Sequence, residues 1–340
     1  MSNHEVPQPG ESDTATATPC WLVAGGAGYI GAHIVRAFLA AGIRPVVLDD
    51  LSSGHREFVP AGVPLVVCSV VNQELVEQVL LDHQVSGIVH LAGFKYAGVS
   101  MQRPLHTYTQ NVTGMVSVLT AAQNVGVNKF VFSSSAGVYG TPSVELVTET
   151  TPTTPESPYG ESKLVGEWIL RDLTRADPSF KAVSLRYFNV VGSGAPGVYD
   201  TSPHNVFPLV IAAIRAGETP RINGDDYPTP DGTCVRDYVH VADLARSHVA
   251  AAKALMDGRE LAPIYNLGSG LGASVKQIMD AFRRVTGIDF TPAIAPRRAG
   301  DPARIVASAE LAARDIDWAN RHTIDEMVRT AWEAPLVTLN

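Results

Sequence analysis

The sequence "VAGGAGYIGAH", residues 23–33, places four glycines between an apolar run and the amphipathic segment "IVRAFLAAG" of residues 34–42. Gly26, Gly28 and Gly31 match the spacing G-x-G-x-x-G. Glycines at this spacing permit a tight turn, let a pyrophosphate approach the backbone and let a helix pack closely on a strand. The free N–H groups of the first helical turn then hold the phosphate. The stretch therefore predicts a strand, a phosphate-binding turn and a helix.

Continuously apolar segments follow this turn and alternate with helical patterns. The apolar segments are residues 44–50, 64–70, 87–93 and 129–135, and helical patterns cover residues 73–83 and 107–126. Buried strands separated by helices of this length are typical of a parallel sheet covered on both faces. We therefore expect an α/β fold with a Rossmann-like, doubly wound parallel sheet, which binds ligands at the carboxyl ends of its strands.

The texture of the sequence changes after Asn189. Residues 192–205 and 222–233 are long loops rich in Gly and Pro, and such loops are usually functional or disordered. We expect a disordered tail at residues 1–18 and a smaller C-terminal mixed α/β domain that binds substrate. The predicted Rossmann domain covers residues 19–189 and about 234–262, and the substrate domain covers about 190–233 and 263–340.

The composition excludes several classes of function. The 340 residues carry a net charge of −8 without a basic stripe, which disfavours nucleic-acid binding. No apolar run reaches the length of a membrane span, and the first 18 residues lack the basic start of a secretory signal. Three scattered cysteines, Cys20, Cys68 and Cys234, form neither a disulfide framework nor a metal pattern. We expect a cytoplasmic protein without a metal site.

Two carboxylates follow the glycine turn at the distance expected for a dinucleotide site. Asp49 comes about 20 residues after the glycines and closes an apolar segment, where its carboxylate can accept the hydroxyls of the adenosine ribose. Asp50 adds a second negative charge. Two carboxylates repel a 2′-phosphate, so the sequence favours NAD over NADP as the cofactor.

Tyr159 and Lys163 stand four positions apart, on one face of the helix that Pro158 begins. An ammonium beside a phenol stabilises the phenolate and lowers its pKa, which is about 10 in isolation. A tyrosine so placed can act as a general base near neutral pH. Ser135 ends an apolar segment, and its hydroxyl can donate a hydrogen bond to a substrate oxygen. These side chains are the predicted catalytic residues.

Several segments resemble the extended short-chain dehydrogenase/reductase family and, within it, the UDP-glucose 4-epimerases, also called UDP-galactose 4-epimerases. The segments are "GGAGYIG" (25–31), "HLAGFKYAGVS" (90–100), "SSSAGVYG" (133–140), "SPYGESK" (157–163), "RYFNVVGS" (186–193), "DYPTPDGTCVRDYVHVADLA" (226–245), "YNLGSG" (265–270) and "PRRAGDPAR" (296–304). The resemblance implies an isomerase of galactose metabolism. Such an enzyme interconverts UDP-galactose and UDP-glucose through a 4-keto intermediate, uses NAD and forms a homodimer.

The resemblance also assigns roles to individual residues. It implies that Tyr159 removes the proton of the sugar 4-hydroxyl, that Lys163 binds the nicotinamide ribose and that Ser135 binds the 4-oxygen. The cofactor-binding residues implied are Gly25, Gly28, Tyr29, Ile30, Gly31, Asp49, Asp50, Leu51, Ser53, Gly54, Ser69, Val70, Leu91, Ala92, Gly93, Lys95, Asn111, Ser133, Tyr159, Lys163 and Phe188. The substrate-binding residues implied are Lys95, Ser135, Tyr159, Asn189, Asn205, Val206, Arg236, Arg298 and Asp301.

The residue chemistry leaves some alternatives open. Arg236 and Arg298 are fork-shaped cations suited to a diphosphate, although Arg236 can instead pair with its neighbour Asp237. Ser69 stands where the family usually has an aspartate at the adenine, and Ile305 stands where the family tunes room for an N-acetyl group. A preference for a UDP-N-acetylhexosamine or a UDP-pentose, or a non-catalytic NAD-binding regulator, therefore remains an alternative. Gly137-Val138 replaces the acid–base pair of a dehydratase and argues against that activity.

Overall fold

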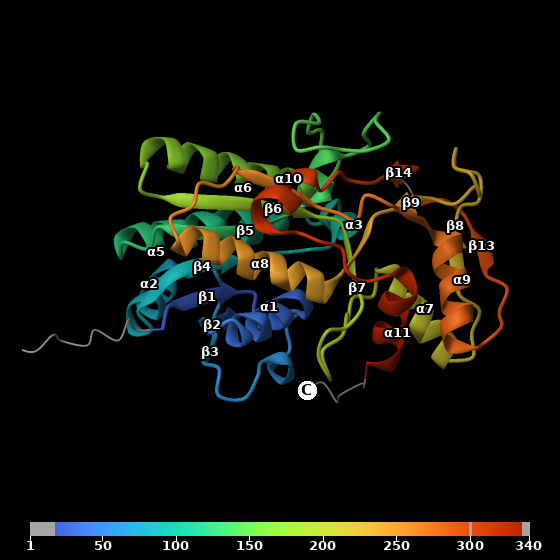
Figure 1. The fold of residues 1–340 in the computed structure, drawn as a ribbon, viewed down its shortest axis with the longest axis horizontal. Helices are drawn as coiled ribbons and strands as arrows, with labels where there is room; N and C mark the ends of the chain where they lie inside the picture. The colour runs from blue at the N-terminus through green and yellow to red at the C-terminus, as the bar shows by residue number, and fades with distance from the viewer. Residues whose placement is uncertain (1–17, 299–300, 335–340) are drawn as a thin grey trace, which may run out of the picture.

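Seven parallel strands form the main sheet, in the order β11-β6-β5-β4-β1-β2-β3. Figure 1 shows the labels from β6 through β5, β4, β1 and β2 to β3 in this order from top to bottom. The computed structural model describes residues 18–298 and 301–334, so the tail predicted at residues 1–18 lies almost entirely outside the described residues. The strands are β1 (Cys20–Ala24), β2 (Arg44–Asp49), β3 (Leu65–Val67), β4 (Val85–His90), β5 (Lys129–Ser135), β6 (Lys181–Tyr187) and β11 (Ile264–Leu267). This sheet confirms the predicted doubly wound α/β fold.

Each strand contributes side chains to two hydrophobic layers because successive residues point to opposite faces. Trp21 and Val23 of β1 face the first layer, whereas Leu22 and Ala24 face the second. The first layer is covered by α1 (Tyr29–Ala40), α8 (Val241–Met256) and α10 (Glu310–Ile316), and the second by α2 (Gln73–Asp82), α5 (Gly114–Asn124) and α6 (Pro158–Ala176). Both faces of the sheet are buried, which explains why the strands lack polar alternation.

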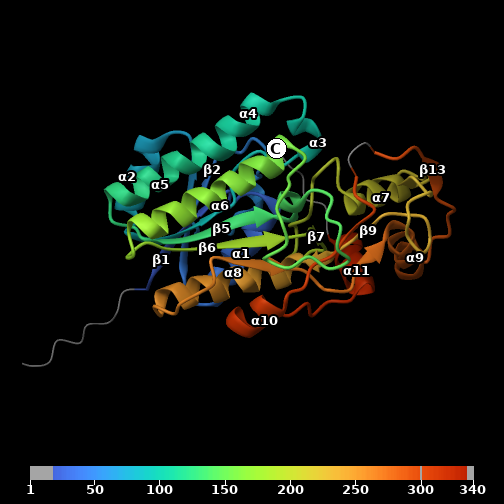
Figure 2. The ribbon, with the colours of Figure 1, turned by 90° about the horizontal axis from the view of Figure 1, so that it is seen from above.

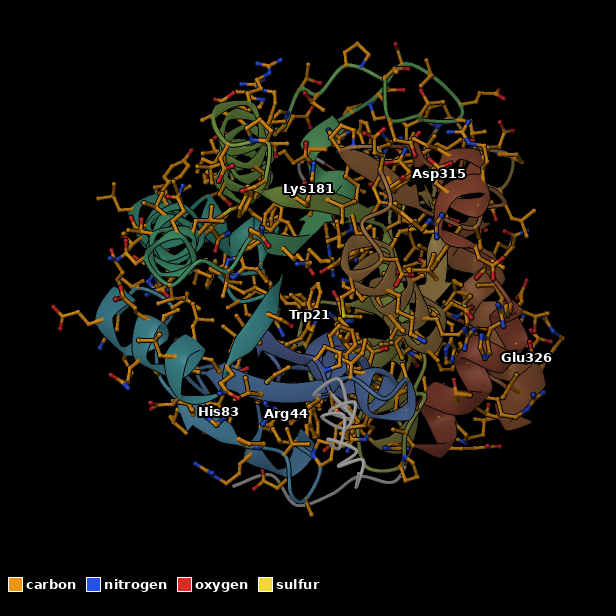
Figure 3. The ribbon with its side chains drawn as sticks, turned by 60° about the vertical axis from the view of Figure 1, so that its left-hand side comes forward. Trp21, Arg44, His83, Lys181, Asp315 and Glu326 are labelled. Carbon is orange, nitrogen blue, oxygen red and sulfur yellow. The ribbon has the colours of Figure 1, made fainter. Side chains whose placement is uncertain are left out.

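Trp21 lies near the centre of the molecule and shows how closely this core is packed (Figure 3). Its ring meets Phe38 of α1 edge to face, with 5.9 Å between the ring centroids. A Cβ atom at Gly87 of β4 would lie only 2.5 Å from the Trp21 ring. Glycine at this strand position therefore makes room for the tryptophan.

The segment predicted as one helix over residues 107–126 is built from several pieces. It begins in α4 (Pro104–Tyr108), passes through one π-helical turn, η2 (Thr109–Thr113), and continues as α5. Short helices also occur at η1 (Arg56–Phe58), α3 (Ala97–Ser100) and η3 (Ala136–Tyr139). π-Helical turns inside α-helices are frequent at functional sites, and this one contains Asn111.

A smaller unit of short strands and helices lies beyond the carboxyl ends of β5 and β6 (Figure 2). Its strands form the pairs β7 (Asn189–Val191) with β10 (Tyr238–His240) and β8 (Arg221–Asn223) with β13 (Ala293–Ala295), and the three-stranded sheet of β12 (Ala273–Ser274), β9 (Val235–Arg236) and β14 (Arg304–Ile305). Its helices are α7 (Val206–Arg215), α9 (Val275–Thr286) and α11 (Ile324–Glu333).

The boundary predicted near residue 262 differs from the strand pairing. β11 was expected in the substrate domain, but it pairs in parallel with β6 and forms an edge of the main sheet. α10 also returns to this sheet, because Ala312 and Ile316 belong to the first hydrophobic layer. The chain thus crosses between the two units more often than the sequence indicated, since a strand as short as "IYNL" gives no signal of its partner.

None of the helices within residues 18–298 and 301–334 is both long and apolar enough to cross a membrane. In the same residues, no group of three or more His, Cys, Asp or Glu side chains is placed to hold a metal ion.

Candidate active site

The glycine turn joins β1 to α1 at the carboxyl edge of the main sheet. Gly25 has a φ of +86°, and a Cβ atom at this position would lie 2.8 Å from the backbone nitrogen of Ala92. A Cβ at Gly31 would lie 2.1 Å from the carbonyl oxygen of Gly25. Gly28 caps α1 without a side chain. The turn therefore leaves the N–H groups of the first helical turn open to a phosphate, as a dinucleotide requires.

At the start of α1, the backbone faces the glycine turn, whereas the Tyr29 side chain points away from it. Tyr29 and Ile30 open the helix, and their position at the turn agrees with the prediction. The Tyr29 hydroxyl, however, donates to the carbonyl oxygen of Gly192 at 2.6 Å, so its phenol is turned toward the loop after β7. Only the backbone of Tyr29 remains available to a pyrophosphate.

Asp49 ends β2 beside the turn and is the predicted partner of the adenosine ribose. Its carboxylate accepts from the backbone N–H groups of Ala27 at 3.0 Å and Leu51 at 2.9 Å. Burial raises the pKa of Asp49, and these two hydrogen bonds lower it. A Cβ at Gly54 would lie 2.6 Å from Asp49 Oδ1, so glycine is required for this close approach.

The other predicted adenosine contacts surround Asp49. Asp50 is exposed and accepts from the N–H of Ser52 at 2.9 Å, and Ser53 is exposed in the same loop. After β3, Ser69 is half-buried and Val70 is buried against Gly114 of α5. The structure thus brings the predicted residues of β2 and β3 to one edge of the sheet, and their contacts with a cofactor remain a prediction.

The loop after β4 forms the next wall of the site. Leu91 and Ala92 both donate their N–H groups to the carbonyl oxygen of Ala24, at 2.9 Å, and Gly93 has a φ of +145°. Lys95 follows, and its ammonium interacts electrostatically with the carboxylates of Asp200 and Asp49. Desolvation lowers the pKa of Lys95, and these two carboxylates raise it.

The three predicted catalytic residues meet where β5 ends and α6 begins. Ser157 caps α6 by accepting the N–H of Gly160 at 3.2 Å, and Pro158 occupies the first turn as predicted. The Tyr159 ring and Ser135 Oγ lie on the same side of Gly137, where a Cβ atom would be 3.6 Å from the ring and 3.4 Å from the hydroxyl. Lys163 Nζ donates to the carbonyl oxygen of Ser133 at 2.9 Å and lies 5.8 Å from the Tyr159 ring centroid.

The pKa values of this group differ in part from the sequence expectation. Tyr159 is half-buried, and its desolvation raises the pKa of the phenol. The neighbouring Ser135 hydroxyl lowers this pKa. Burial also lowers the pKa of Lys163 to about 8. The ammonium faces the Ser133 carbonyl and does not by itself make the phenol acidic. A further positive charge, such as an oxidised nicotinamide ring, is needed to favour the phenolate.

Three other predicted cofactor residues make contacts within the protein. Asn111 is buried, and its side-chain amide binds the backbone N–H and carbonyl of Phe94 and the hydroxyl of Ser162. Ser133 is fully buried, with its hydroxyl 3.2 Å from His248 Nε2. Phe188 packs in a cluster that includes Tyr139 and Ile305. Asn111 therefore fixes the loop that contains Phe94, and Ser133 joins β5 to α8.

Arg236 and Asp301 lie together on the substrate side of the site. Arg236 is buried, and its Nη2 lies 3.4 Å from Asp301 Oδ1 but makes no hydrogen bond to any residue that the structure describes. Asp237, the alternative partner considered from the sequence, instead accepts from Ser269, Gly270 and Ala307. Arg298 is exposed, and its Nη1 lies 3.5 Å from the carbonyl oxygen of His204. A buried guanidinium with an unused donor suits an anionic ligand such as a diphosphate.

The remaining predicted substrate residues lie at the start of β7 and at the start of α7. Asn189 is the exposed first residue of β7, and its N–H donates to the carbonyl oxygen of Asp237. Asn205 caps α7, Val206 is its first residue, and Asn205 Nδ2 donates to Asp200 Oδ2 at 2.7 Å. Asp200 was missed by the sequence reasoning. It lies between Lys95 and Asn205, and the only signal was the length of loop 192–205.

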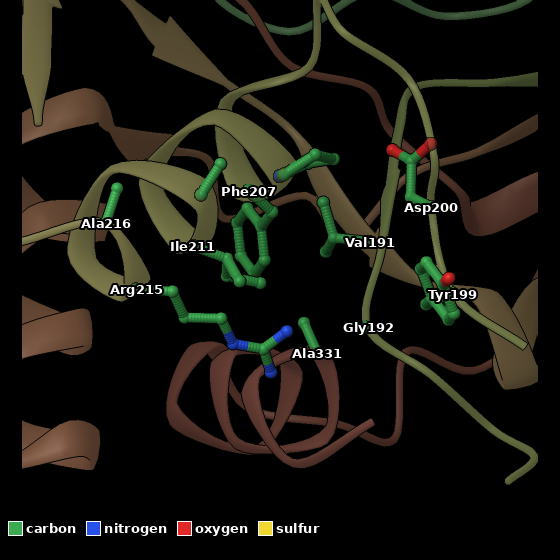
Figure 4. A pocket seen from close by; sticks show the side chains of 11 residues that line it. Val191, Gly192, Tyr199, Asp200, Phe207, Ile211, Arg215, Ala216 and Ala331 are labelled. Atoms are coloured by element: carbon green, nitrogen blue, oxygen red, sulfur yellow. The ribbon is translucent and has the colours of Figure 1, made fainter. Parts of the chain in front are cut away.

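A pocket of about 500 Å³ lies beside this loop, and Figure 4 shows its lining. Phe207, Ile211 and Arg215 of α7 form one wall, and Ala331 of α11 another. Arg215 Nη2 donates to the carbonyl oxygen of Trp332 at 2.7 Å, which holds α7 and α11 together. None of the predicted catalytic side chains lines this pocket.

Comparisons with known proteins agree with this geometry. The model of the NAD dependent epimerase/dehydratase family matches residues 21–268. The UDP-glucose 4-epimerase of Azospirillum brasilense is 41% identical over 96% of this chain and 95% of its own length. The Bifidobacterium longum UDP-glucose 4-epimerase, solved with NAD+ and UDP, is 36% identical with a TM-score of 0.84, covering 92% of this chain and 97% of its own. The UDP-Glc/GlcNAc 4-epimerase of Campylobacter jejuni is 35% identical with a TM-score of 0.81, covering 93% of this chain and 98% of its own.

Proposed function

Because this chain belongs to the NAD-dependent epimerase/dehydratase family, we propose that it is a UDP-glucose 4-epimerase that interconverts UDP-galactose and UDP-glucose. The observation that carries the proposal is that Tyr159 and Ser135 lie side by side, since a Cβ atom at Gly137 would lie 3.6 Å from the Tyr159 ring and 3.4 Å from Ser135 Oγ. Lys163 is held at the Ser133 carbonyl, at the same edge of the sheet as the glycine turn. A base, a hydroxyl donor and a dinucleotide site are together what a reversible oxidation at a sugar carbon requires.

The chain fits NAD at three places. The glycine turn has no room for side chains at Gly25 and Gly31, so its backbone can meet a pyrophosphate. We assign the adenosine ribose to the Asp49 carboxylate, which lies beside the glycine turn, and we expect the charge of Asp50 to repel a 2′-phosphate. When bound, NAD supplies a nicotinamide that takes a hydride from the sugar C4 and returns it, so the reaction has no net redox change.

The side chains of the chain carry out the proton transfer. Tyr159, as phenolate, accepts the proton of the sugar 4-hydroxyl when C4 is oxidised, and it returns the proton when C4 is reduced. Ser135 donates a hydrogen bond to the 4-oxygen and steadies it between the alcohol and the ketone. Lys163 keeps a positive charge in the site, which favours the phenolate form of Tyr159.

The diphosphate remains bound while the sugar turns. Arg236 offers an unused buried Nη2 donor, and Arg298 adds an exposed cation near His204. Both guanidinium groups are permanently charged and can donate N–H groups to phosphate oxygens. A fixed diphosphate lets the 4-keto sugar rotate about its link and present its other face, which inverts the configuration at C4.

The test is a direct assay of the purified protein with UDP-galactose and UDP-glucose and no added reductant. We expect both sugars to reach the same equilibrium mixture. Tyr159→Phe should lower kcat by at least about 100-fold, since a positioned acid–base group contributes about that much. The variant should keep its bound NAD and its melting temperature.

Each contrary result has a definite meaning. An inactive parent protein that nevertheless binds NAD would favour the non-catalytic regulator. Full turnover by Tyr159→Phe would remove Tyr159 from the role of base.

A second substrate class follows from the sugar side of the site. Ile305 is buried in the cluster that contains Phe188, and it is smaller than a tyrosine at that position would be. The Campylobacter jejuni relative is named for activity on both UDP-Glc and UDP-GlcNAc. A panel of UDP-hexoses, UDP-N-acetylhexosamines and UDP-pentoses, assayed by kcat/KM, decides which sugars this chain accepts.

A homodimer and a cytoplasmic location remain predictions. The homodimer is supported by exposed apolar side chains on two helices of the main unit, Val116 of α5 at 46% and Trp168 of α6 at 47% exposure. Light scattering on Trp168→Glu tests the dimer, since a charge in an apolar interface should produce monomers.

A further inference from the structure

A buried ion pair lies one helical turn beyond Lys163. Arg186 Nη2 lies 2.6 Å from Glu167 Oε2, and Arg186 Nε lies 2.8 Å from Glu167 Oε1, so the guanidinium binds the carboxylate with two parallel hydrogen bonds. Each side chain is only 3% exposed. Removing two charges from water is costly, and apolar residues of similar volume often serve stability equally well. Stability alone therefore does not account for this pair.

The pair is connected to three further elements. The Ser134 hydroxyl of β5 donates to Glu167 Oε1 at 2.6 Å. Arg186 Nη1 donates to the Tyr139 hydroxyl of η3 at 2.9 Å, and this hydroxyl donates to Asn266 Oδ1 of β11 at 2.7 Å. One connected network thus joins α6, β5, β6, η3 and β11.

The network adjoins the predicted catalytic residues on α6 and on β5. Tyr159, Lys163 and Glu167 follow one another at intervals of four and share one face of α6. On β5, Ser134 separates Ser133, whose carbonyl accepts from Lys163 Nζ, from Ser135, whose hydroxyl lies beside Tyr159. A shift of α6 relative to β5 would therefore lengthen both of these contacts at once.

We propose that Glu167 and Arg186 are positioning residues that fix α6 against β5 so that Tyr159, Lys163 and Ser135 keep their mutual geometry. The inference rests on the proposed function, because it concerns the residues assigned to that reaction. Each side chain is only 3% exposed, so we assign neither a direct contact with the substrate. Their bidentate contact has a single geometry, unlike an apolar contact, which tolerates sliding. Small displacements of reacting groups cost large factors in rate, so the pair acts on kcat.

The decisive experiment replaces the pair with apolar residues of similar volume, in the double variant Glu167→Leu with Arg186→Met, and assays the NAD-loaded protein. We expect the double variant to have a melting temperature close to that of the parent, because apolar residues can replace a buried ion pair without loss of stability. We expect its kcat to be about 10- to 100-fold lower than that of the parent and its KM for UDP-galactose to be unchanged. If the pair served stability alone, the double variant would have both the melting temperature and the kcat of the parent. A parental kcat in this variant would overturn the proposal.

Ser134→Ala is the milder variant, in case the double variant does not fold. It keeps the ion pair and removes only the hydroxyl that links Glu167 to β5. We expect a several-fold lower kcat, an unchanged KM and a pH profile whose acidic limb is displaced, because the Tyr159–Ser135 contact changes. An unaltered kcat and pH profile in Ser134→Ala would also overturn the proposal.

Arg284→Gln serves as the matched control. It breaks the exposed pair between α9 and α11, in which Arg284 Nη2 lies 2.6 Å from Asp325 Oδ1, and it should leave kcat unchanged. The parent protein is assayed first. An inactive parent contradicts the proposed function, whereas an active parent with unaffected variants contradicts only the positioning role.

Discussion

At the scale of single residues, Gly31 is the position where the cofactor site tolerates no side chain. Its missing Cβ would meet the Gly25 carbonyl oxygen at 2.1 Å, and this neighbour is backbone that cannot move aside. We expect Gly31→Ala to distort the turn and to yield protein purified without NAD. Gly98→Ala is the matched control, because no atom lies within 4 Å of the added methyl group. Cofactor content is measured by absorbance after denaturation, and parental NAD content in Gly31→Ala would contradict the assigned site.

Lys163 predicts how the activity depends on pH. Burial lowers the pKa of its ammonium to about 8, so the charge is complete below that pH and is lost as the pH rises through 8. We expect the loss of this charge to disfavour the phenolate of Tyr159 when the cofactor is bound. We therefore expect kcat to fall on the alkaline side of about pH 8. In Lys163→Met the charge is absent at every pH, so kcat should be low throughout and this alkaline limb should disappear.

The residues that the sequence predicted are those with a chemical signature of their own. Glycine spacing, a terminal aspartate and a Tyr-x-x-x-Lys pair each have a direct physical meaning, and the structure brings all of them to one edge of the sheet. Asp200 and the Glu167–Arg186 pair lacked such a signature. Glu167 pairs with a residue of another element, and Asp200 acts on Lys95 from a distant loop, so only the folded chain reveals their roles.

At the scale of elements, α6 depends on its cap because it carries Tyr159 and Lys163. Ser157 Oγ accepts the N–H of Gly160, and the loss of such a cap costs about 1 kcal/mol. We expect Ser157→Ala to lower the free energy of unfolding by that amount, whereas Ser157→Asp should retain the cap and most of the stability. Urea unfolding of the two variants checks this, and equal stabilities would show that the cap contributes nothing.

The sequence predicted most elements of the main sheet correctly, for a simple reason. Strands such as "WLVA" are apolar throughout because both faces of the sheet are covered, and the helices between them carry clear periodicity. The allocation of β11 could not be read in the same way. Strand pairing is a contact between distant segments, and the four residues of β11 join β6 only after the chain has passed through the smaller unit. The π-helical turn η2 likewise leaves no pattern in composition.

At the scale of the whole molecule, buried histidines join parts of the chain that are distant in sequence. His33 of α1 accepts the N–H of Gly194 at its Nε2, which ties α1 to the loop after β7. The His240 ring stacks on His322 at 3.8 Å and contacts Thr330 of α11. His248 of α8 contacts Ser133 of β5. The rings of His33 and His240 each accept a backbone N–H at one nitrogen, which requires that nitrogen to carry no proton.

The pKa values of these rings make stability depend on pH. Burial lowers the pKa to about 4 in His33 and His248 and to about 3 in His90 and His240, from an ordinary value of 6.5. The unfolded chain therefore binds more protons than the folded chain below pH 6.5, and stability is lost as the pH falls. Each histidine should cost on the order of 1 kcal/mol between pH 6.5 and 5.5. The carboxylates of Asp49, Asp200 and Asp237 have pKa values raised by desolvation and act in the opposite direction at lower pH.

Urea unfolding at intervals between pH 7.5 and 5.5 tests this dependence in the parent and in one variant. His90 is the best ring to remove, because it lies between Phe130 and Phe132 and its Nδ1 has no hydrogen-bond partner among the described residues. His90→Leu should be tolerated and should reduce the slope of the unfolding free energy against pH by about the share of one histidine. A parent whose stability is constant from pH 6.5 to 5.5 would show that the buried rings are not the acid-sensitive part of the fold. An unchanged slope in His90→Leu alone would exempt only that ring.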